Sequence, residues 1–229
     1  MSEVAAVIVA AGRGNRMRSE IPKQYLNLVN RPVLAHTLQI FQSCPLINEV
    51  ILVANKDEKD KTQQEIIKAY AFDKVTQVVA GGRERQDSVY NGLLALSAET
   101  NLVVVHDGVR PLLTVDLLER SIYEGQKYGA VIPGVPVKDT IKIANTEGFV
   151  QKTPPRDALW AVQTPQVFKK DLLLAAMEKA KKSNFCCTDE AGIVEWYGEK
   201  VKIFPGELEN IKITTPEDLT FATMILEKR

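Results

Sequence analysis

The sequence predicts an α/β protein with a Rossmann-like, doubly wound, mostly parallel sheet and a protruding β-hairpin arm. Residues 4–11 are an unbroken run of small and β-branched apolar side chains, which suits a strand buried on both faces as in a parallel sheet. Similar apolar runs then alternate with segments in which apolar residues recur at helical spacing. Between residues 138 and 156 this rhythm gives way to short alternating segments, the pattern of a hairpin.

The remaining elements follow from the same patterns. Helices are expected where a capping residue or a proline precedes helical spacing, as at Thr188 and Pro216. Pro133 and Pro136 interrupt the strand expected at 130–137, and because proline cannot donate to a sheet ladder they predict a bulged or edge course. The expected strands are 50–53, 75–79, 102–105, 130–137, 160–162, 200–204 and 210–214, and the expected helices are 32–43, 58–70, 89–96, 114–128, 170–182, 188 onwards and 216–228.

Length and composition exclude several classes of protein. The 229 residues fit a single domain, 1–229, that is long enough to bury a substantial core. The 29 basic and 29 acidic residues cancel, so any anion site must be local, and neither nucleic acid nor a membrane is expected as a partner. No apolar run approaches the ~20 residues of a membrane span, and no basic residue precedes the first apolar run as in a signal peptide.

The cysteines indicate a reducing compartment, and the cysteines and histidines together give no support to a zinc site. Cys44, Cys186 and Cys187 give an odd count, and the adjacent pair lacks metal-ligand spacing. His36 and His106 are the only histidines, so a zinc cluster is not expected. Reduced thiols and a cytoplasmic location are the expectation.

The first expected strand opens into a loop with the features of a phosphate site. Gly12 and Gly14 allow backbone N–H groups to approach oxygen atoms, and Arg16, Arg18 and Lys23 follow closely enough to neutralise them. A glycine that merely turns the chain is the alternative explanation. On this evidence alone, phosphate binding and simple chain reversal both stay open.

Two common phosphate motifs are excluded in this loop. Met17 occupies the position of the third glycine in G-x-G-x-x-G, and the P-loop pattern is absent. What remains is A-A-G-x-G-x-R-M, followed by P-K-Q-Y at 22–25. This pairing resembles the nucleotidyltransferases that join a nucleoside triphosphate to a sugar phosphate. In those enzymes the first loop wraps the triphosphate and the lysine faces the α-phosphate.

A second glycine-containing loop follows the strand expected at 75–79. Gly81 and Gly82 precede basic residues and Ser88, after which a helix is expected. Because a doubly wound sheet binds its ligands beyond the carboxyl ends of the strands, both loops should meet at one crevice, which favours phosphate binding. Ser88 is explained either as a helix cap or as a hydroxyl that contacts a base edge.

A third group of polar residues follows the strand expected at 102–105. Asp107 is placed to approach a metal or substrate hydroxyls at the same crevice, and Arg110 accompanies it; a solvated turn aspartate is the alternative. His106 raises the hypothesis of a Ser-His-Asp hydrolase with Ser88 and Asp107. We disfavour it, because G-x-S-x-G is absent and two neighbours at one strand end cannot easily form a relay.

Residues 138–156 form the expected β-arm. Two short alternating segments, 138–143 and 149–152, flank a plausible turn at 145–148. Such a ribbon is marginal in water by itself, so it should pack on something else. A second copy of the chain is the natural partner, and a flap lying on its own domain is the alternative.

These loops belong to an ordered series of motifs that resembles the 2-C-methyl-D-erythritol 4-phosphate cytidylyltransferase family of the non-mevalonate isoprenoid pathway. The resemblance covers essentially the whole chain, and the ordered set is far more specific than any single motif. One departure is Gly108, where some members have alanine; glycine should loosen the backbone there without removing a functional group. The series is AAGRGNRM, PKQY, GGRERQDSV, HDGVRP, VKDT, QTPQ, TDEA and NIKITTPEDL.

The resemblance implies a site for CTP. The cytidine would be held largely by backbone contacts to its base, and Gly14, Arg16 and Lys23 would bind the triphosphate. Mg²⁺ or another divalent cation would bridge the triphosphate oxygens with few protein ligands, and Asp107 is the one candidate for direct ligation. The residues implied for the cytidine are Ala10, Ala11, Gly12, Gly81, Gly82 and Ser88.

The resemblance also implies a site for the acceptor, a small sugar-alcohol phosphate. Asp107, Arg110 and Thr164 would line the methylerythritol pocket, with Lys212 between the two phosphates. Thr140 and Arg156, at the two ends of the arm, would reach the substrate phosphate in the partner subunit of a homodimer. The residues implied for catalysis are Arg16, Lys23, Arg156 and Lys212.

The chemistry that this implies depends on charge. A phosphate monoester is already ionised near neutral pH, since its second pKa is ~6, so no general base is needed for its attack on the α-phosphorus of CTP. Positioning and cations should supply most of the catalysis.

Three alternatives remain open. They are a ribitol 5-phosphate cytidylyltransferase, a guanylyl- or uridylyltransferase, and a catalytically silent nucleotide sensor on the same fold. The first would share the nucleotide loops and the cation arrangement, and the second would be revealed by competition between nucleotides. A sensor would have no reason to retain Arg16, Lys23 and Lys212 together.

Overall fold

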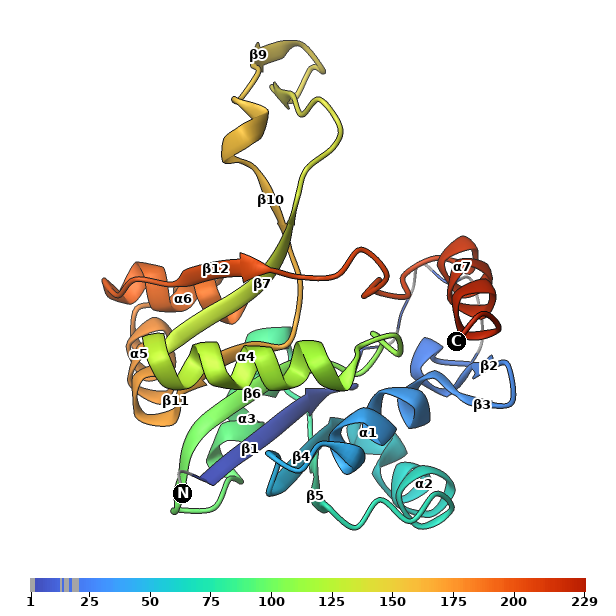
Figure 1. Ribbon diagram of the computed structural model, residues 1–229. Coiled ribbons are helices and arrows are strands. Elements are labelled where there is room, and N and C mark those ends of the chain that lie inside the picture. Colours follow the sequence, from blue (N-terminus) through green and yellow to red (C-terminus); the bar gives the residue numbers. More distant parts are fainter. Residues whose placement is uncertain (1–2, 13, 15–16, 18–20) are drawn as a thin grey trace.

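One mixed sheet organises the chain, and the computed structural model describes residues 3–12, 14, 17 and 21–229. Within these residues the sheet has eight strands in the order β10-β7-β11-β6-β1-β4-β5, with β12 paired to β7 (Figure 1). All strands run in one direction except β10 and β11, so the predicted fold class, a mostly parallel α/β sheet, is confirmed. The strands are β1 (Glu3–Val9), β4 (Glu49–Ala54), β5 (Val75–Ala80), β6 (Thr100–Asp107), β7 (Ala130–Pro136), β10 (Trp160–Val162), β11 (Gln166–Lys169) and β12 (Lys202–Pro205).

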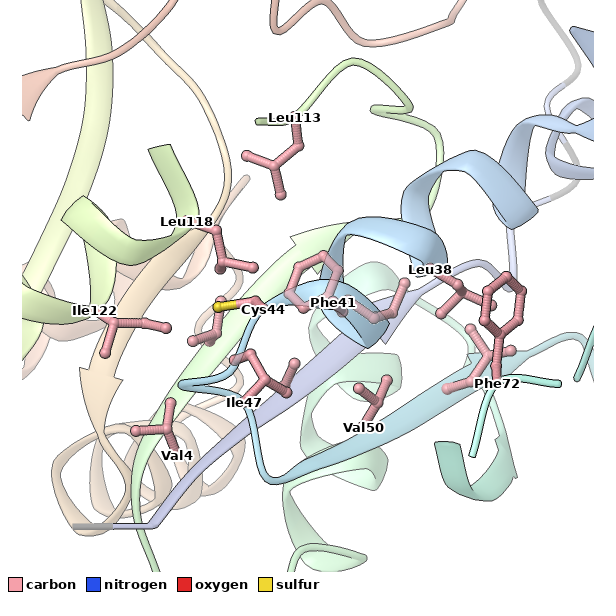
Figure 2. Packing of buried hydrophobic residues seen from close by; sticks show 14 of the residues in the cluster. Val4, Leu38, Phe41, Cys44, Ile47, Val50, Phe72, Leu113, Leu118 and Ile122 are labelled. Carbon is pink, nitrogen blue, oxygen red and sulfur yellow. The ribbon is translucent and has the colours of Figure 1, made fainter. Parts of the chain in front are cut away.

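Helices cover both faces of this sheet (Figure 1). One face packs against α1, α4 and the helical segment of α2 and η4, and the other packs against α3, α5 and α6. Figure 2 shows the first of these two cores, where Phe41, Cys44 and Leu118 meet above the strands. The helical segments are α1 (Val33–Ser43), η3 (Lys56–Glu58), α2 (Lys59–Thr62), the π-helical turn η4 (Gln63–Lys68), α3 (Arg85–Leu94), α4 (Val115–Tyr128), α5 (Lys170–Lys182), α6 (Glu190–Tyr197) and α7 (Pro216–Leu226).

The first strand shows why an unbroken apolar run was needed. Val4, Ala6 and Ile8 belong to the core under α1 and α4, while Ala5 and Val7 belong to the core under α3 and α5. Successive side chains of a strand point to opposite faces, so a strand with helices on both sides must be apolar at every position. Each fully buried valine or isoleucine contributes roughly 1.5–3 kcal/mol to folding.

The strand order reverses beside β1. The chain runs from β1 outwards to β4 and β5 and then returns to β6 on the other side of β1. The carboxyl ends of β1 and β6 therefore flank a topological switch point, the place where open α/β sheets bind ligands. Ala10 follows β1, and Asp107 is the last residue of β6.

Two strand expectations were wrong. β7 is an inner strand, because it pairs with β11 and β10 on one side and with β12 on the other. Pro133 is tolerated because it lies between the part of β7 that pairs with β11 and the part that pairs with β10. Residues 210–214 form no strand; they run across the carboxyl edge, where Ile213 N–H donates to the carbonyl oxygen of Val109 at 2.9 Å.

Two helix starts also differ from expectation. α3 begins at Arg85, where Glu84 and Asp87 form a capping box, so Ser88 lies inside the first turn and is not the cap. α6 is capped by Asp189, whose side chain accepts a hydrogen bond from Gly192 N–H, and not by Thr188. In both cases an acidic residue at the helix start took the capping role that a hydroxyl was expected to fill.

The segment between β7 and β10 projects from the body as an arm (Figure 1). Its two short strands, β8 (Ile143–Ala144) and β9 (Val150–Lys152), are antiparallel, and the turn between them is closed by Asn145. Residues 138–142 were expected to be strand but are irregular. Small elements outside the sheet are β2 (Asn27–Leu28), β3 (Arg31–Pro32) and the 3₁₀ turns η2 (Lys23–Tyr25) and η5 (Arg156–Ala158).

None of the helices within the described residues has both the length and the apolar composition that a membrane crossing needs.

Candidate active site

A cleft, here called the first cleft, opens at the switch point of the sheet. It measures about 660 Å³ with the open space at its mouth included. The loops after β1, β5 and β6 form its walls, together with η2 and the segment 210–214. The lining residues are Val9, Ala10, Ala11, Gly12, Lys23, Gln24, Gly82, Arg83, Glu84, Arg85, Ser88, Asp107, Val109 and Lys212.

Two glycines allow the loop after β5 to lie against its neighbours. A Cβ at Gly81 would be 2.4 Å from the Cβ of Ala11, and a Cβ at Gly82 would be 2.2 Å from that of Asp87. Both overlaps involve atoms held close to the backbone, so these positions require glycine. A Cβ at Gly12, in contrast, would meet no described atom within 4 Å, and the missing side chain leaves space in the cleft.

The Ser88 hydroxyl is nearly saturated by the protein. It accepts from Gly82 N–H at 3.1 Å and donates to the carbonyl oxygen of Glu84 at 3.1 Å. A hydroxyl has one proton and two lone pairs, so one lone pair is left. Towards anything bound in the first cleft, Ser88 is therefore a hydrogen-bond acceptor.

Lys23 and Lys212 lie at the same cleft although they are 189 positions apart in the sequence. Lys23 Nζ donates to the carbonyl oxygen of Ile213, the residue next to Lys212, at 2.9 Å. Gln24 Nε2 donates to the carbonyl oxygen of Ala10 at 2.8 Å. The η2 turn thus links the loop after β1 to the segment 210–214 and places two of the predicted phosphate cations together.

Asp107 lies at the centre of a cluster of cations. Its Oδ1 accepts from Arg85 Nε at 3.2 Å, and its Oδ2 lies 2.9 Å from Lys212 Nζ and 3.5 Å from Arg110 Nε. Burial alone would raise the pKa of this carboxyl, but the three cations outweigh burial and hold the pKa well below its usual range. Asp107 is buried, so the alternative of a solvated turn aspartate was wrong.

Arg85 and Glu190 were not among the predicted site residues. Glu190 is 1% exposed, and its two carboxylate oxygens lie 2.6 and 2.8 Å from Arg85 Nη1. Burial lowers the pKa of the Arg85 guanidinium, but Glu190 and Asp107 together shift it upwards, so the cation is fixed in place. Both residues stand in recognised motifs, yet nothing in the sequence indicates that residues 105 positions apart form a pair.

A second cleft of about 530 Å³ adjoins the first. The two clefts share Arg85, Asp107 and Lys212, which form the wall between them. Predicted acceptor residues Arg110 and Thr164 line the second cleft and not the first. The lining residues are Arg85, Asp107, Arg110, Val162, Gln163, Thr164, Gln166, Thr188, Asp189 and Lys212.

Thr164 is joined to the neighbouring strand β6. Its Oγ1 lies 2.9 Å from His106 Nδ1 and accepts from Asp107 N–H at 3.2 Å. His106 is fully buried, and burial lowers its pKa to about 3, so the imidazole is neutral. Its Nδ1 meets Thr164 and not Ser88, a geometry that gives the disfavoured Ser-His-Asp relay no support.

Several predicted residues lie apart from both clefts. Thr140 and Arg156 are exposed on the arm, where Arg156 Nη1 donates to the carbonyl oxygen of Lys138. Gly14, with φ of 68°, packs against the Lys23 side chain, and Arg16 lies outside the described residues. Within the described part of the chain, no three His, Cys, Asp or Glu side chains gather as they would around a bound metal.

Comparison with known proteins finds the family that the sequence motifs resemble, over nearly the full length of the chain. Residues 4–228 match the family model for 2-C-methyl-D-erythritol 4-phosphate cytidylyltransferase. The protein of that name from Alkaliphilus oremlandii is 48% identical over 229 residues, covering 100% of this chain and 97% of the relative. That from Pelotomaculum thermopropionicum is 46% identical, covering 100% and 96%.

Solved structures agree with the sequence relatives. The 4-diphosphocytidyl-2C-methyl-D-erythritol synthase of Anaerococcus prevotii superposes with a TM-score of 0.87 at 38% identity, covering 99% of this chain and 96% of the other. The 2-C-methyl-D-erythritol 4-phosphate cytidylyltransferase of Thermus thermophilus gives 0.81 at 31% identity, covering 98% and 99%. Ordered motifs, a crevice at the switch point and full-length similarity all agree: the chain belongs to the 2-C-methyl-D-erythritol 4-phosphate cytidylyltransferase family.

Proposed function

We propose that this enzyme transfers CMP from CTP to 2-C-methyl-D-erythritol 4-phosphate, giving 4-diphosphocytidyl-2-C-methyl-D-erythritol and pyrophosphate. The observation that carries the proposal is the wall shared by the two clefts. Arg85, Asp107 and Lys212 face both, so a nucleotide in the first cleft and a polyol phosphate in the second would meet across the same cations. A reaction between two anions needs such an arrangement, because their repulsion must be offset where they touch.

The first cleft is proposed to hold CTP. Its glycine-lined loops leave the base in contact with backbone atoms of Ala10, Ala11 and Gly82. The remaining lone pair of Ser88 suits a donor, and the exocyclic amino group of cytosine is a donor where uracil has a carbonyl oxygen. Lys23 and Lys212 then face the triphosphate, together with Arg16 from the loop that follows β1.

The second cleft is proposed to hold the acceptor, with Arg110 and Thr164 beside its polyol chain. The acceptor phosphate attacks the α-phosphorus of CTP in line, and pyrophosphate leaves from the opposite side. Because this nucleophile is already ionised, no side chain has to remove a proton from it. Lys23, Lys212 and Arg16 stabilise charge on the transferring group, and Arg156 from the arm is the fourth catalytic cation.

A divalent cation is proposed to arrive with CTP as part of the substrate. Magnesium is commonly held through substrate phosphates and one or two carboxylates. Asp107 was the candidate for direct ligation, but its two oxygens are engaged by Arg85, Lys212 and Arg110. We therefore assign the metal to the triphosphate oxygens and Asp107 to the cation cluster.

Residues 1–229 are proposed to form one domain, and its arm, residues 138–156, is proposed to bind a second copy of the chain. Ile143, Phe149 and Val150 expose 47%, 68% and 59% of their surface on it, and exposed apolar groups of this kind mark interaction sites. A C₂ dimer would bury the arm against the partner and carry Thr140 and Arg156 to the partner's acceptor phosphate.

A heterodimer test distinguishes a shared site from a self-contained one. Lys212→Gln inactivates the crevice of one protomer, and Arg156→Gln inactivates the arm of the other. If arms serve the partner, the purified heterodimer has one intact site of two and about half the wild-type activity. If each arm serves its own crevice, both sites are damaged and the heterodimer is inactive.

The proposed activity is tested by pyrophosphate release from purified protein with CTP and Mg²⁺. We expect turnover with 2-C-methyl-D-erythritol 4-phosphate and at least tenfold lower kcat/KM with ribitol 5-phosphate or with UTP or GTP. Preference for ribitol 5-phosphate would assign the rival acceptor. CTP binding without pyrophosphate release from either acceptor would identify a sensor.

The free thiols support a reducing compartment. Cys44, Cys186 and Cys187 are unpaired. We propose the cytoplasm as the location, because disulfides are rare where thiols are kept reduced.

A further inference from the structure

His106 is a buried polar side chain to which the proposed reaction gives no task. It is 0% exposed, packs beside Phe41 with ring centroids 5.3 Å apart, and stands directly before Asp107. Both ring nitrogens nevertheless have polar neighbours. Nδ1 lies 2.9 Å from Thr164 Oγ1, and Nε2 lies 3.4 Å from the carbonyl oxygen of Arg110.

The proton positions follow from what these neighbours can accept. A backbone carbonyl has no proton to give, so the contact with Arg110 is attractive only when Nε2 carries the imidazole proton. A neutral imidazole has one such proton, which leaves Nδ1 as an acceptor. The hydrogen bond between Nδ1 and Thr164 must then use the Thr164 hydroxyl proton.

This assignment fixes the polarity of Thr164. Its oxygen donates its only proton to His106 and accepts one hydrogen bond from Asp107 N–H at 3.2 Å. One lone pair is left, and no proton. Towards the second cleft, Thr164 can only accept.

We infer that His106 is a specificity-determining positioning residue: by taking the hydroxyl proton of Thr164, it makes Thr164 an acceptor for an alcohol hydroxyl of the bound acceptor. The inference rests on the proposed function for the identity of that polyol. It assigns His106 no contact with substrate; His106 acts through Thr164.

The rest of the second cleft is consistent with this role. Gln163 uses one N–H and its oxygen on Glu207, and Gln166 uses one N–H on Asp189 and its oxygen on Ala191, so both side chains are held in place by the protein and each keeps one further N–H. Asp107 is a carboxylate and also only accepts. Thr164 and Asp107 therefore present acceptors to alcohol hydroxyls, whereas Arg110 and Lys212 serve the anionic groups.

The tautomer can be measured directly in the intact protein. The chain has two histidines, so long-range ¹H–¹⁵N correlation spectra at pH 7.5 show two imidazoles, and His36→Gln assigns them. We expect His106 to be the neutral Nε2–H tautomer. An Nδ1–H tautomer or an imidazolium would overturn the inference, because the Thr164 hydroxyl would then be free to donate.

Substrate analogues test the consequence for recognition. Each hydroxyl of 2-C-methyl-D-erythritol 4-phosphate is replaced in turn by hydrogen or by fluorine, which accepts but cannot donate. Thr164→Val identifies the hydroxyl bound by Thr164, since its removal then costs nothing further. In the wild-type protein we expect both replacements at that hydroxyl to lower kcat/KM equally, by roughly tenfold, the equivalent of one hydrogen bond of ~1.4 kcal/mol.

A fluorinated analogue that keeps most of the natural kcat/KM while the deoxy analogue loses it would overturn the inference. So would a Thr164→Val enzyme that discriminates all analogues as the wild type does. His106→Phe preserves the ring beside Phe41 but leaves the Thr164 hydroxyl free to donate. In this variant we expect a higher kcat/KM for the fluorinated analogue than for the deoxy analogue. The wild-type analogue series and the tautomer measurement decide the question even when this variant does not fold. Absence of any turnover with the natural acceptor refutes the proposed function instead.

Discussion

Replacing Glu190 with glutamine tests the buried ion pair that holds the wall between the clefts. Glu190→Gln keeps the shape of the side chain and removes its charge. Arg85 then loses its closest anionic partner, at 2.6 Å, but keeps Asp107 at 3.2 Å, and its side chain is 27% exposed. Breaking a fully buried pair costs ~3–5 kcal/mol, and the remaining partner and solvent reduce this to about 2–3 kcal/mol here.

Urea unfolding followed by circular dichroism measures this loss. At this chain length a loss of that size corresponds to a melting temperature roughly 5–10 °C lower. Glu195→Gln, an exposed glutamate on the same helix, is the matched control and should change stability by less than ~0.5 kcal/mol. Arg85→Met alone should cost at least as much as Glu190→Gln, since it leaves a buried carboxylate without its main partner.

The double variant Arg85→Met with Glu190→Gln completes the cycle. Removing both charges removes the unpaired ion, so the double variant should be more stable than the sum of the two single losses predicts. Strict additivity, or a Glu190→Gln protein as stable as the Glu195→Gln control, would refute the view that this pair is electrostatically coupled.

Three further predictions concern the cations, the base and the buried histidine. Lys23→Met should lower kcat by ~10²–10³ with little change in the dissociation constant for CTP measured by calorimetry. The control Lys68→Met, at an exposed lysine, should change neither quantity. An unchanged kcat in Lys23→Met would show that Lys23 is not a catalytic residue. Ser88→Ala should narrow the kcat/KM preference for CTP over UTP, and an unaltered preference would assign base selection to the backbone alone. His106, whose native pKa is about 3 against 6.5 for the unperturbed group, contributes stability that is complete above pH 6.5 and is lost as pH falls towards 3. The contribution of His106 to the free energy of unfolding should be about 2 kcal/mol smaller at pH 5 than at pH 8. A His106→Phe protein whose free energy of unfolding depends on pH as that of the wild type does would contradict this.

The central part of the fold could be read from the sequence because its signals are local. A two-faced parallel strand has to be apolar at every position, and residues 4–11 are. Gly81 and Gly82 were expected in a loop at the crevice, and the structure adds that a Cβ at these positions would overlap the Cβ of Ala11 and of Asp87. The ordered motifs identified the family, which the full-length relatives confirm.

Partnerships between distant residues could not be predicted in this way. The course of β7 depends on which strands lie beside it, so its prolines suggested an edge when the strand is internal. Residues 210–214 have strand-like composition but no strand edge to join, and they cross the clefts instead. Helix caps were misplaced by one to four residues, because acids and hydroxyls compete locally for the same N–H groups.

The chemical character of the site was therefore set by the sequence: glycine loops, cations and one aspartate at the carboxyl edge of a sheet. Only the tertiary structure decided how those charges are held. Glu190 fixes Arg85, Arg85 and Lys212 share Asp107, and His106 takes the proton of Thr164. Hydrogen bonds and ion pairs act over about 3 Å in space, and separation along the chain carries no information about which atoms will come that close.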